Sequence, residues 1–450
     1  MVATRGSRSK TGAGQASSQK RAGRSSETGA ARASPPQRFI SFAAVRWAVV
    51  AAIAAVALRR KAPAPGICPV DPAACHFSQH LDGARSLLRM RAAALKDVCN
   101  VSVSRLPEVA PGLATDAVVV DACTDSTANC STLVHLSGVH GVEGYAGSAI
   151  QSSLLLLWAW GENAGDRCPP RGTRAVLIHA VNPFGMAYGR RWNEKGVDLN
   201  RNALKLSEPF EGLVDRRRDV EDAYAELSSL LNPTSWSELT FWWRALTTVA
   251  RKGFVATKRV LVSGQYSVPD GLWFGGKELQ KSHKYVLKFL GKVVEPSSRI
   301  FLVDAHTGLG PSGVDTLMAL GDDASLDGVR HVFGEPDGTF LYGETATGAA
   351  SGYDATIGDV PRGYADRLGW TNARGLTQEF GTVPGLLVAR ALVRENAAWH
   401  HGDEAEQRAA VRDVRDAFCV PSAAWQASVV ERGVTVARQV LAGLADGRLP

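Results

Sequence analysis

Short apolar runs alternate along this chain with longer amphipathic segments, and this alternation limits its possible folds more than any other feature. The apolar runs lie at 117–121, 132–137, 174–182, 300–305, 316–320 and 376–380. Near-continuous apolar runs of this length are typical of strands that are covered on both faces. Segments with helical periodicity lie at 146–160, 214–231, 238–252, 281–290, 386–400 and 425–444. The sequence therefore predicts an α/β fold, a three-layer α/β/α sandwich around a mixed, largely parallel sheet.

The positive charge of the chain is concentrated at its amino terminus. Among 450 residues, the formal net charge is +7, but residues 1–61 hold twelve of the 51 basic side chains and one of the 44 acidic ones, Glu27. Residues 62–450 are left with a net charge of −4. A mildly acidic body lacks the basic surface that nucleic-acid binding requires, so we expect no nucleic-acid partner.

The amino-terminal region divides into a polar and an apolar part. Residues 1–38 are rich in Ser, Arg, Gly and Ala, which predicts a disordered basic tail. Residues 39–58 are close to the ~20 apolar residues that span a bilayer as a helix, although Arg46 interrupts them. The basic tail favours an uncleaved signal anchor with a cytosolic amino terminus. A cleaved signal, an organelle-targeting sequence and a buried helix are the alternatives. We expect 39–61 to be the anchor or targeting segment, 62–115 a linker and amino-terminal cap, and 116–450 the catalytic domain.

Seven cysteines, most of them soon after the apolar segment, suggest disulfide bonds. Cys68 and Cys75, like Cys123 and Cys130, are seven residues apart in segments able to form short loops, but spacing does not fix the pairing. The sequences that begin at Asn100 and Asn129 match the glycosylation pattern. We therefore expect a membrane-anchored protein with a lumenal or extracellular body, or a secreted one. The alternative is a plastid or mitochondrial protein with free thiols.

Side chains with metal-binding or acid-base chemistry stand at the ends of three apolar runs. In an open α/β sheet, ligands bind beyond the carboxyl ends of the strands. His140 and Glu143 follow the run at 132–137 across a glycine-rich turn, and His306 ends the run that starts at residue 300. Two imidazoles and one carboxylate suit zinc and leave a coordination position open for water. Taken singly, each has a plain alternative, a helix start with an ordinary acid or a histidine that hydrogen-bonds in a loop.

The third run carries Glu379 inside a strand of apolar residues. Burying an unpaired carboxylate is costly, so this side chain needs a partner or a function. A segment between the first two sites gathers guanidinium and amide groups, of which Arg190, Arg191, Asn200 and Arg201 are the candidates for binding a carboxylate or an oxyanion. A solvated, charge-rich turn is the alternative for that segment.

Taken together and in this order, the motifs resemble the zinc carboxypeptidase family. They are His-Gly-Val-Glu-Gly, Asn-Pro-Phe-Gly, Asp-Leu-Asn-Arg-Asn, His-Thr-Gly-Leu-Gly and Glu-Phe-Gly-Thr, and the resemblance runs from about Leu133 to Thr382. It is similar in particular to a little-characterised carboxypeptidase-like branch. The resemblance implies a zinc-dependent hydrolase of the carboxypeptidase fold, with one Zn²⁺ per chain.

The resemblance also implies roles for individual residues. His140, Glu143 and His306 match the zinc ligands, and Glu379 matches the general base. Asn200 and Arg201 match the pair that binds the terminal carboxylate of a substrate. Arg191 is preferred over Arg190 as the group that stabilises the oxyanion, and Arg190 is then a substrate-binding candidate. No motif matches the mobile tyrosine of the family, for which Tyr342 and Tyr353 are guesses.

Three functions are compatible with these motifs. The first is a metallocarboxypeptidase that trims peptides, and the second is an N-acyl amino acid deacylase similar to aspartoacylase and succinylglutamate desuccinylase. The third is a catalytically inactive, membrane-tethered binding protein. A serine hydrolase is disfavoured because the nucleophile elbow Gly-x-Ser-x-Gly does not occur, and the helix motif His-Glu-x-x-His of other zinc proteases is absent as well.

Overall fold

A computed structural model describes residues 76–123, 130–160, 167–319, 330–336, 338, 340–342 and 356–449. Contacts divide the chain into two units, Met1–Ile67 and Cys68–Pro450, and all described residues belong to the second. The predicted tail at 1–38 and the apolar segment at 39–58 lie outside the described residues. Among the described residues, no helix combines the length and the apolar composition needed to cross a bilayer.

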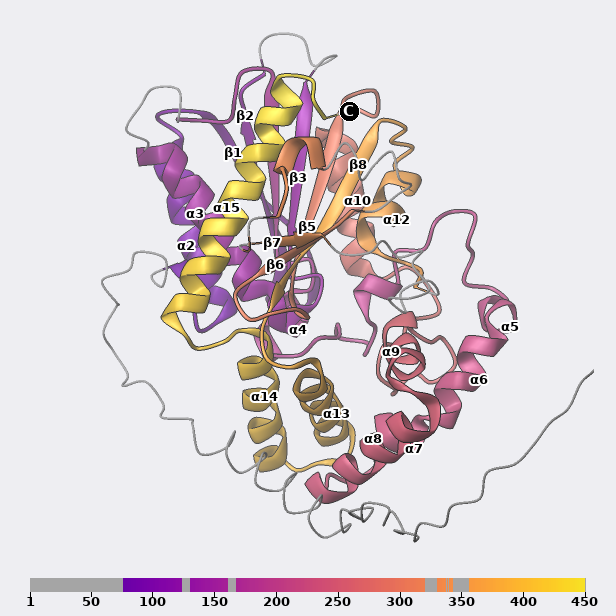
Figure 1. Ribbon diagram of the computed structural model, residues 1–450. Coiled ribbons are helices and arrows are strands. Elements are labelled where there is room, and N and C mark those ends of the chain that lie inside the picture. The colour runs from indigo at the N-terminus through magenta and orange to yellow at the C-terminus, as the bar shows by residue number, and fades with distance from the viewer. Residues whose placement is uncertain are drawn as a thin grey trace, which may run out of the picture. The chain divides into compact units, whose positions relative to one another are not determined.

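Eight strands of the described residues form one mixed sheet (Figure 1) in the order β1-β2-β4-β3-β5-β8-β6-β7. Its centre, β4-β3-β5-β8, is parallel, whereas β2 and β6 pair antiparallel with its two sides. The strands are β1 (Asn100–Ala110), β2 (Leu113–Asp121), β3 (Ser131–Ser137), β4 (Thr173–His179), β5 (Ile300–Gly308), β6 (Asp315–Ala319), β7 (Phe340–Tyr342) and β8 (Ala373–Gly381). The parallel centre places the carboxyl ends of β3, β5 and β8 side by side.

Helices cover both faces of this sheet. Leu133 and Leu177 pack on one face against α2 (Leu81–Leu95), α3 (Gly144–Trp160) and α15 (Ala423–Ala445). Val134 and Ile178, one residue further along the same strands, pack on the other face against α10 (Lys281–Val293) and α12 (Val360–Arg367). Alternate residues of each strand thus enter different cores, as the pleat requires. The predicted α/β/α sandwich is confirmed.

A further group of helices lies beyond one end of the sheet (Figure 1). It comprises α5 (Leu213–Arg216), α6 (Arg218–Glu226), α7 (Ser228–Leu231), α8 (Glu238–Lys252), α9 (Phe254–Ser263), α13 (Gly385–His401) and α14 (Glu404–Phe418). Several of these helices share one apolar core, to which Tyr224, Phe241 and Leu392 contribute. Because α14 contacts β5 and the short helix that carries Glu143, this group lies against the carboxyl ends of the central strands.

Most predicted elements occur within a few residues of their predicted positions. The helix predicted at 238–252 is α8, and the one predicted at 214–231 is divided into α5, α6 and α7. The strands β1 and β7 and the helices α2, α4 (Pro183–Tyr188), α9, α12 and α14 were not predicted. The strand β1 was missed because it lies at the sheet edge, contains Pro107 and exposes most of its side chains, so that it lacks the apolar run of a central strand.

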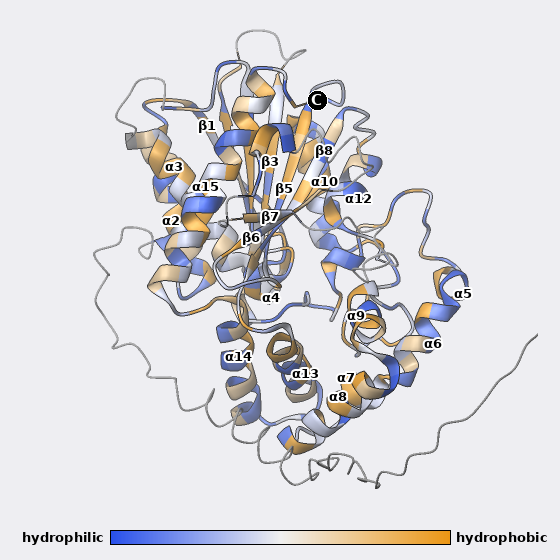
Figure 2. Ribbon diagram, viewed as in Figure 1, coloured by the Kyte–Doolittle hydropathy of each residue, from blue (hydrophilic) through white to orange (hydrophobic). Residues whose placement is uncertain are grey.

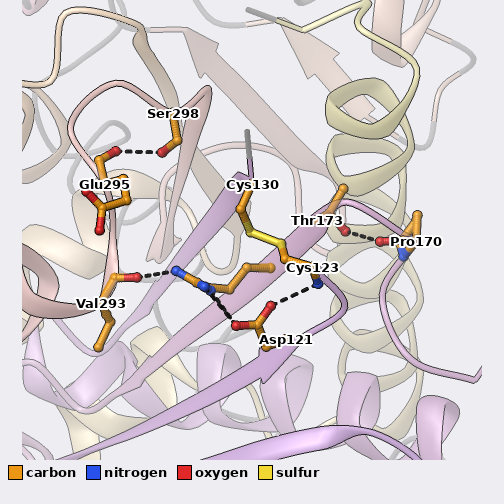
Figure 3. The surroundings of a disulfide bond; sticks show 9 residues. Asp121, Cys123, Cys130, Pro170, Thr173, Val293, Glu295 and Ser298 are labelled. Carbon is orange, nitrogen blue, oxygen red and sulfur yellow. Dashed lines mark hydrogen bonds and ion pairs between the residues drawn. A yellow bond between two sulfur atoms is a disulfide. The ribbon is translucent and has the colours of Figure 1, made fainter. Parts of the chain in front are cut away.

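Two disulfide bonds tie loops to the sheet. Cys123 pairs with Cys130, one of the two pairs suggested by the seven-residue spacing, and Cys99 pairs with Cys168. Figure 3 shows the first bond beside Asp121, whose carboxylate accepts hydrogen bonds from the Cys123 amide and from Arg174. Cys68 and Cys75 lie outside the described residues.

Candidate metal centre and cavity

His140, Glu143 and His306 bring their side chains together at the carboxyl ends of β3 and β5. The two histidine Nδ1 atoms lie 3.0 Å apart. Nδ1 of His306 is 3.0 Å from Oε2 of Glu143, and Nδ1 of His140 is 2.9 Å from Oε1 of the same carboxylate. All three residues are buried. The predicted ligand set is therefore assembled around one point.

The loop that carries His140 and Glu143 is fixed by a close backbone contact. After β3 the chain turns at Gly138, which has a φ of 66°, and Gly141 begins the short helix η3 (Gly141–Glu143). A Cβ atom at Gly141 would lie 2.0 Å from the backbone of Gly185, so only glycine fits there. Gly185 belongs to α4 (Pro183–Tyr188), whose N-cap Asn182 holds it by a side-chain hydrogen bond. The Asn-Pro-Phe-Gly motif thus supports the metal-binding loop.

Each candidate histidine has a carboxylate beside its second ring nitrogen. Nε2 of His140 is 3.1 Å from Oδ1 of Asp198, and Nε2 of His306 is 2.8 Å from Oδ2 of Asp304. A carboxylate beside Nε2 favours the tautomer with the proton on that atom and leaves the lone pair of Nδ1 toward the shared point. Two lone pairs 3.0 Å apart repel unless a cation or a proton lies between them. The donor set of two imidazoles and one carboxylate therefore fits Zn²⁺.

Charges around the centre keep Glu143 and Asp198 ionised. Burial alone would raise the pKa of the Glu143 carboxyl, but His140 and His306 outweigh it and hold that pKa well below its usual range. Burial is likewise outweighed at Asp198, where Arg191 and His140 hold the pKa far below its usual value. A second cluster of potential ligands, Asp121 with Cys123 and Cys130, is unsuited to a metal because both thiols are in a disulfide.

Glu379 lies on β8 in register with His306 of β5, and both side chains line the same cavity. Its Oε1 accepts a hydrogen bond of 2.9 Å from the amide of Leu309. Burial, with a smaller contribution from the charge of Glu143, raises the pKa of Glu379 to about 7. A carboxyl group poised near neutrality beside a cation site is suited to accept and return a proton.

The two adjacent arginines point in different directions. Arg191 lines the cavity and donates to Oδ2 of Asp198 over 3.0 Å and to Oε1 of Glu143 over 3.2 Å. Arg190 turns away, donates to Oε1 of Glu395 over 2.6 Å and lies 3.9 Å from the ring centroid of Trp399. Arg190 is not among the residues that line the cavity and forms a buried ion pair with Glu395, which gives its predicted substrate contact no support.

Asn200 and Arg201 lie in the short helix η4 (Leu199–Arg201) and line the cavity. The Asn200 side-chain oxygen accepts from the amide of Val360 over 3.1 Å. The guanidinium of Arg201 donates to the carbonyls of Val262 and Asn200. The predicted pair is thus at the site, with Arg201 already hydrogen-bonded to the backbone at the end of α9. Tyr342, by contrast, donates to the carbonyl of Gly334 and does not line the cavity, and Tyr353 lies outside the described residues.

A cavity of about 270 Å³ connects these groups. On the strand side it is lined by the candidate metal ligands and Glu379. On the opposite side α8, α9 and α13 supply mostly apolar side chains, namely Val249, Phe254, Leu261, Val262, Val388 and Leu392. A molecule bound here would place one part against charged groups and another against a hydrocarbon wall.

The sequence analysis missed several residues of this site. Asp198 was quoted within the Asp-Leu-Asn-Arg-Asn motif, and only the folded chain shows that it supports His140 and Arg191. Arg362 lines the cavity from α12 and donates to its own N-cap residue, Asp359. The sequence around Arg362 signals a helix start, since Asp359 is followed by a proline in the first turn, but it does not reveal which way the arginine points.

Comparison with known proteins gives one family match. A family model described as "Protein of unknown function (DUF2817)" matches residues 77–432. No curated protein matches the sequence.

Solved structures similar to this chain include the following three. Carboxypeptidase A from Helicoverpa armigera is 12% identical, the match covers 84% of this chain and 82% of that chain, and the TM-score is 0.40. Thrombin activatable fibrinolysis inhibitor is 12% identical, with 78% of this chain and 76% of that chain covered and a TM-score of 0.42. A metallo-carboxypeptidase from Burkholderia cenocepacia is 13% identical, with 77% and 68% covered and a TM-score of 0.35. Alignments of this quality assign no function, so the site has to be interpreted from its own residues.

Proposed function

This chain belongs to the DUF2817 family of proteins of unknown function, and from its site we propose that it is a zinc-dependent hydrolase that cleaves an amide bond next to a free carboxylate. The observation that carries this proposal is the meeting of two histidine Nδ1 atoms and both oxygens of Glu143 at one buried point. Glu379 stands beside that point, in register with His306 and lining the same cavity. Hydrolysis by metal-activated water requires a cation site with a proton acceptor beside it.

The residues of the chain have separate tasks in this proposal. His140, Glu143 and His306 hold the metal, which when bound supplies Lewis-acid chemistry that activates water and polarises a carbonyl group. Glu379 takes a proton from the attacking water and returns it to the leaving nitrogen. Oε1 of Glu379 is already held by the Leu309 amide, which leaves Oε2 as the atom that carries the proton. Arg191 lines the cavity beside Glu143 and is proposed to stabilise the oxyanion.

The free carboxylate of the substrate is proposed to bind at Asn200 and Arg201. Arg201 would have to exchange a backbone acceptor for the substrate, because its guanidinium donates to the carbonyls of Val262 and Asn200. Arg362, on the same cavity, is the alternative cation. Arg201→Ala and Arg362→Ala distinguish the two, since loss of the true partner raises KM for substrates with a free carboxylate and leaves KM for their amides unchanged.

We propose a metallocarboxypeptidase as the first activity and an N-acyl amino acid deacylase as the second. The apolar wall formed by α8, α9 and α13 supports both, since it suits the side chain of a peptide or the acyl chain of an N-acyl amino acid. The experiment offers hippuryl-type peptides and N-acyl amino acids of several chain lengths to the full chain, with and without a zinc chelator. Zinc-dependent release of either product supports a hydrolase and selects its substrate. Metal binding without turnover of any substrate would favour the inactive binding protein instead.

We further propose that the folded body lies outside the cytosol, either held by residues 39–58 or secreted. The disulfides Cys99–Cys168 and Cys123–Cys130 support this placement, because such bonds persist in oxidising compartments. Asn100, one of the two predicted glycosylation sites, is exposed at the start of β1, whereas Asn129 lies outside the described residues. Loss of an endoglycosidase-induced mass shift in Asn100→Gln would support glycosylation there. An unglycosylated body found in a plastid or mitochondrion would contradict the placement.

A further inference from the structure

The helix α8 exposes apolar side chains on the side opposite to the one it buries. Phe241 and Ala245 are buried in the core that α8 shares with α13 and α14. Leu239, Trp243 and Leu246 are 73%, 66% and 57% exposed. Their spacing of four and three residues places them along one face of the helix. Figure 2 shows hydrophobic residues on this helix beyond the end of the sheet. An exposed apolar stripe of this kind on a surface helix is typical of a surface that binds another protein or a membrane.

The same apolar surface extends to the cavity. Ala250, the next exposed residue at this spacing, is followed by Phe254 and Val255 at the start of α9, which are 68% and 49% exposed. Phe254 also lines the cavity, as does the exposed Leu386 from the start of α13. Phe254, which follows α8 in the chain, is therefore both exposed and part of the apolar wall of the cavity.

The residues of α8 and α9 are also basic, unlike the rest of the body. Five basic residues occur on these two helices, namely Arg244, Arg251, Lys252, Lys258 and Arg259, and the one acidic residue, Glu238, is bound to Arg390. Lys252 is ion-paired with Glu226 at the end of α6, which leaves four basic residues as the local excess. Residues 62–450 as a whole carry a net charge of −4, so this positive charge is local. Exposed apolar residues, including a tryptophan, flanked by basic ones are typical of helices that lie in the surface of an anionic bilayer.

We propose that α8 and α9 form a docking surface for a lipid bilayer whose leaflet on the side of the folded body carries anionic lipid, and that they hold the rim of the cavity against it. Leu239, Trp243, Leu246 and Phe254 enter the boundary between headgroups and acyl chains, while Arg251 lies at the headgroup level. A second copy of this chain would bury the apolar stripe equally well, but it would bring like charges together. This surface does not depend on the proposed hydrolase activity, and its test uses no substrate.

The test has to report on α8 and α9 alone. Residues 39–58 are themselves expected to bind a membrane, so co-sedimentation of the full chain with vesicles would measure mainly that segment. Amide hydrogen exchange of the full chain is measured alone, with vesicles of phosphatidylcholine, and with vesicles of phosphatidylcholine and phosphatidylserine in equal amounts. We expect slower exchange in residues 237–263 with the mixed vesicles, and a weaker effect with phosphatidylcholine alone. Unchanged exchange in this segment with the mixed vesicles would overturn the proposal.

Substitutions distinguish the contribution of the apolar residues to vesicle binding from that of the basic residues. Trp243→Gln with Leu246→Gln should weaken the vesicle-induced protection at least ~10-fold in lipid concentration, because two apolar side chains no longer leave water. Leu206→Gln is the matched control, since Leu206 is as exposed as Trp243 (66%) but lies outside α8 and α9. Arg251→Gln should weaken binding to the mixed vesicles about fivefold and leave binding to phosphatidylcholine unchanged.

Two further outcomes would also contradict the proposal. The first is a loss of protection in Leu206→Gln as large as that in Trp243→Gln with Leu246→Gln. That result would show that replacing any exposed apolar residue by a polar one weakens vesicle binding. The second is slower exchange in residues 237–263 that depends on protein concentration without vesicles and disappears in Trp243→Gln with Leu246→Gln. That result would assign the surface to a second copy of the chain.

Discussion

The two sides of the cavity differ in chemistry: one presents charged groups and the other presents apolar side chains. On the strand side, His140, Glu143 and His306 are buried and linked to further charges, so that each polar group has a partner nearby. On the helix side, Leu261 and Val262 of α9 are partly exposed and present hydrocarbon. The strand side is held by hydrogen-bonded register and a tight glycine contact, whereas the helix side is held by side-chain packing and by a few side-chain contacts, such as those of Arg201 with Val262 and of Arg390 with Glu238. This difference suggests that chemistry resides on the strand side and substrate choice on the helix side.

Removing one candidate metal ligand should have the largest effect. His140→Ala or His306→Ala should lower the zinc content from about one per chain to near zero and abolish hydrolysis, because a two-ligand remnant binds weakly. Metal analysis of purified full-length protein measures the first effect. His401→Ala, an exposed histidine of α13, is the control and should retain its metal. Full zinc content in both ligand variants would show that the strand side is not a metal site.

Glu379→Gln should separate catalysis from metal binding on that same side. The amide keeps the volume and the acceptor for the Leu309 amide but cannot take up a proton, so we expect kcat to fall at least ~10²-fold with zinc retained. Glu404→Gln, on the exposed surface of α14, is the control for loss of a carboxylate. Near-normal turnover would remove the general-base role, and loss of zinc would make Glu379 a metal ligand.

The comparison of the two sides also explains what the sequence could predict. The apolar runs predicted β3, β5 and β8, and the polar residues at their ends predicted the metal ligands and Glu379, because strand periodicity and the cost of burying charge are local properties. Their convergence depends on the order β3-β5-β8 in the sheet, which chain order does not give, since β4, β6 and β7 intervene.

The helix side was not predictable in the same way. The bounds of α8 were predicted correctly, but α9 follows directly after Gly253 and was missed. Which face of each helix meets the cavity depends on packing among α8, α9 and α13, and an apolar residue of the wall has the same pattern as one of the core. The sequence also did not show which of Arg190 and Arg191 faces the cavity. Outside helices and strands, the direction of a side chain does not follow from its position in the sequence.

A buried histidine that supports the short helix η4 should make stability depend on pH. His283 of α10 donates from Nε2 to the carbonyl of Leu199 in η4 and accepts from the Tyr364 hydroxyl. Burial lowers its pKa from 6.5 to about 4. Below pH 6.5 the unfolded chain takes up a proton that the folded chain accepts only near pH 4. The folded state therefore loses stability as pH falls between these values, by about 3 kcal/mol at this residue.

His283→Gln isolates that contribution. The variant should be less stable than the parent at pH 7, and the difference in free energy of unfolding should narrow as pH falls toward 4, because the variant has no proton to exclude. Urea unfolding at a series of pH values measures it, and the other histidines cancel in the difference. A difference that does not vary with pH would mean that His283 has the same pKa in the folded and unfolded chains.

The smallest effect is expected on the helix side. Leu261→Ala removes part of the apolar wall, so KM should rise about tenfold for substrates with a large apolar group and little for those with a small one, at unchanged kcat. Val260→Ala is the matched control, because Val260 is the preceding residue of α9 and packs against the same core without lining the cavity. Initial rates over a series of acyl or side-chain lengths measure the effect. If Leu261→Ala instead lowers kcat equally for all substrates, α9 acts on the chemistry itself, and the division between the two sides of the cavity is wrong.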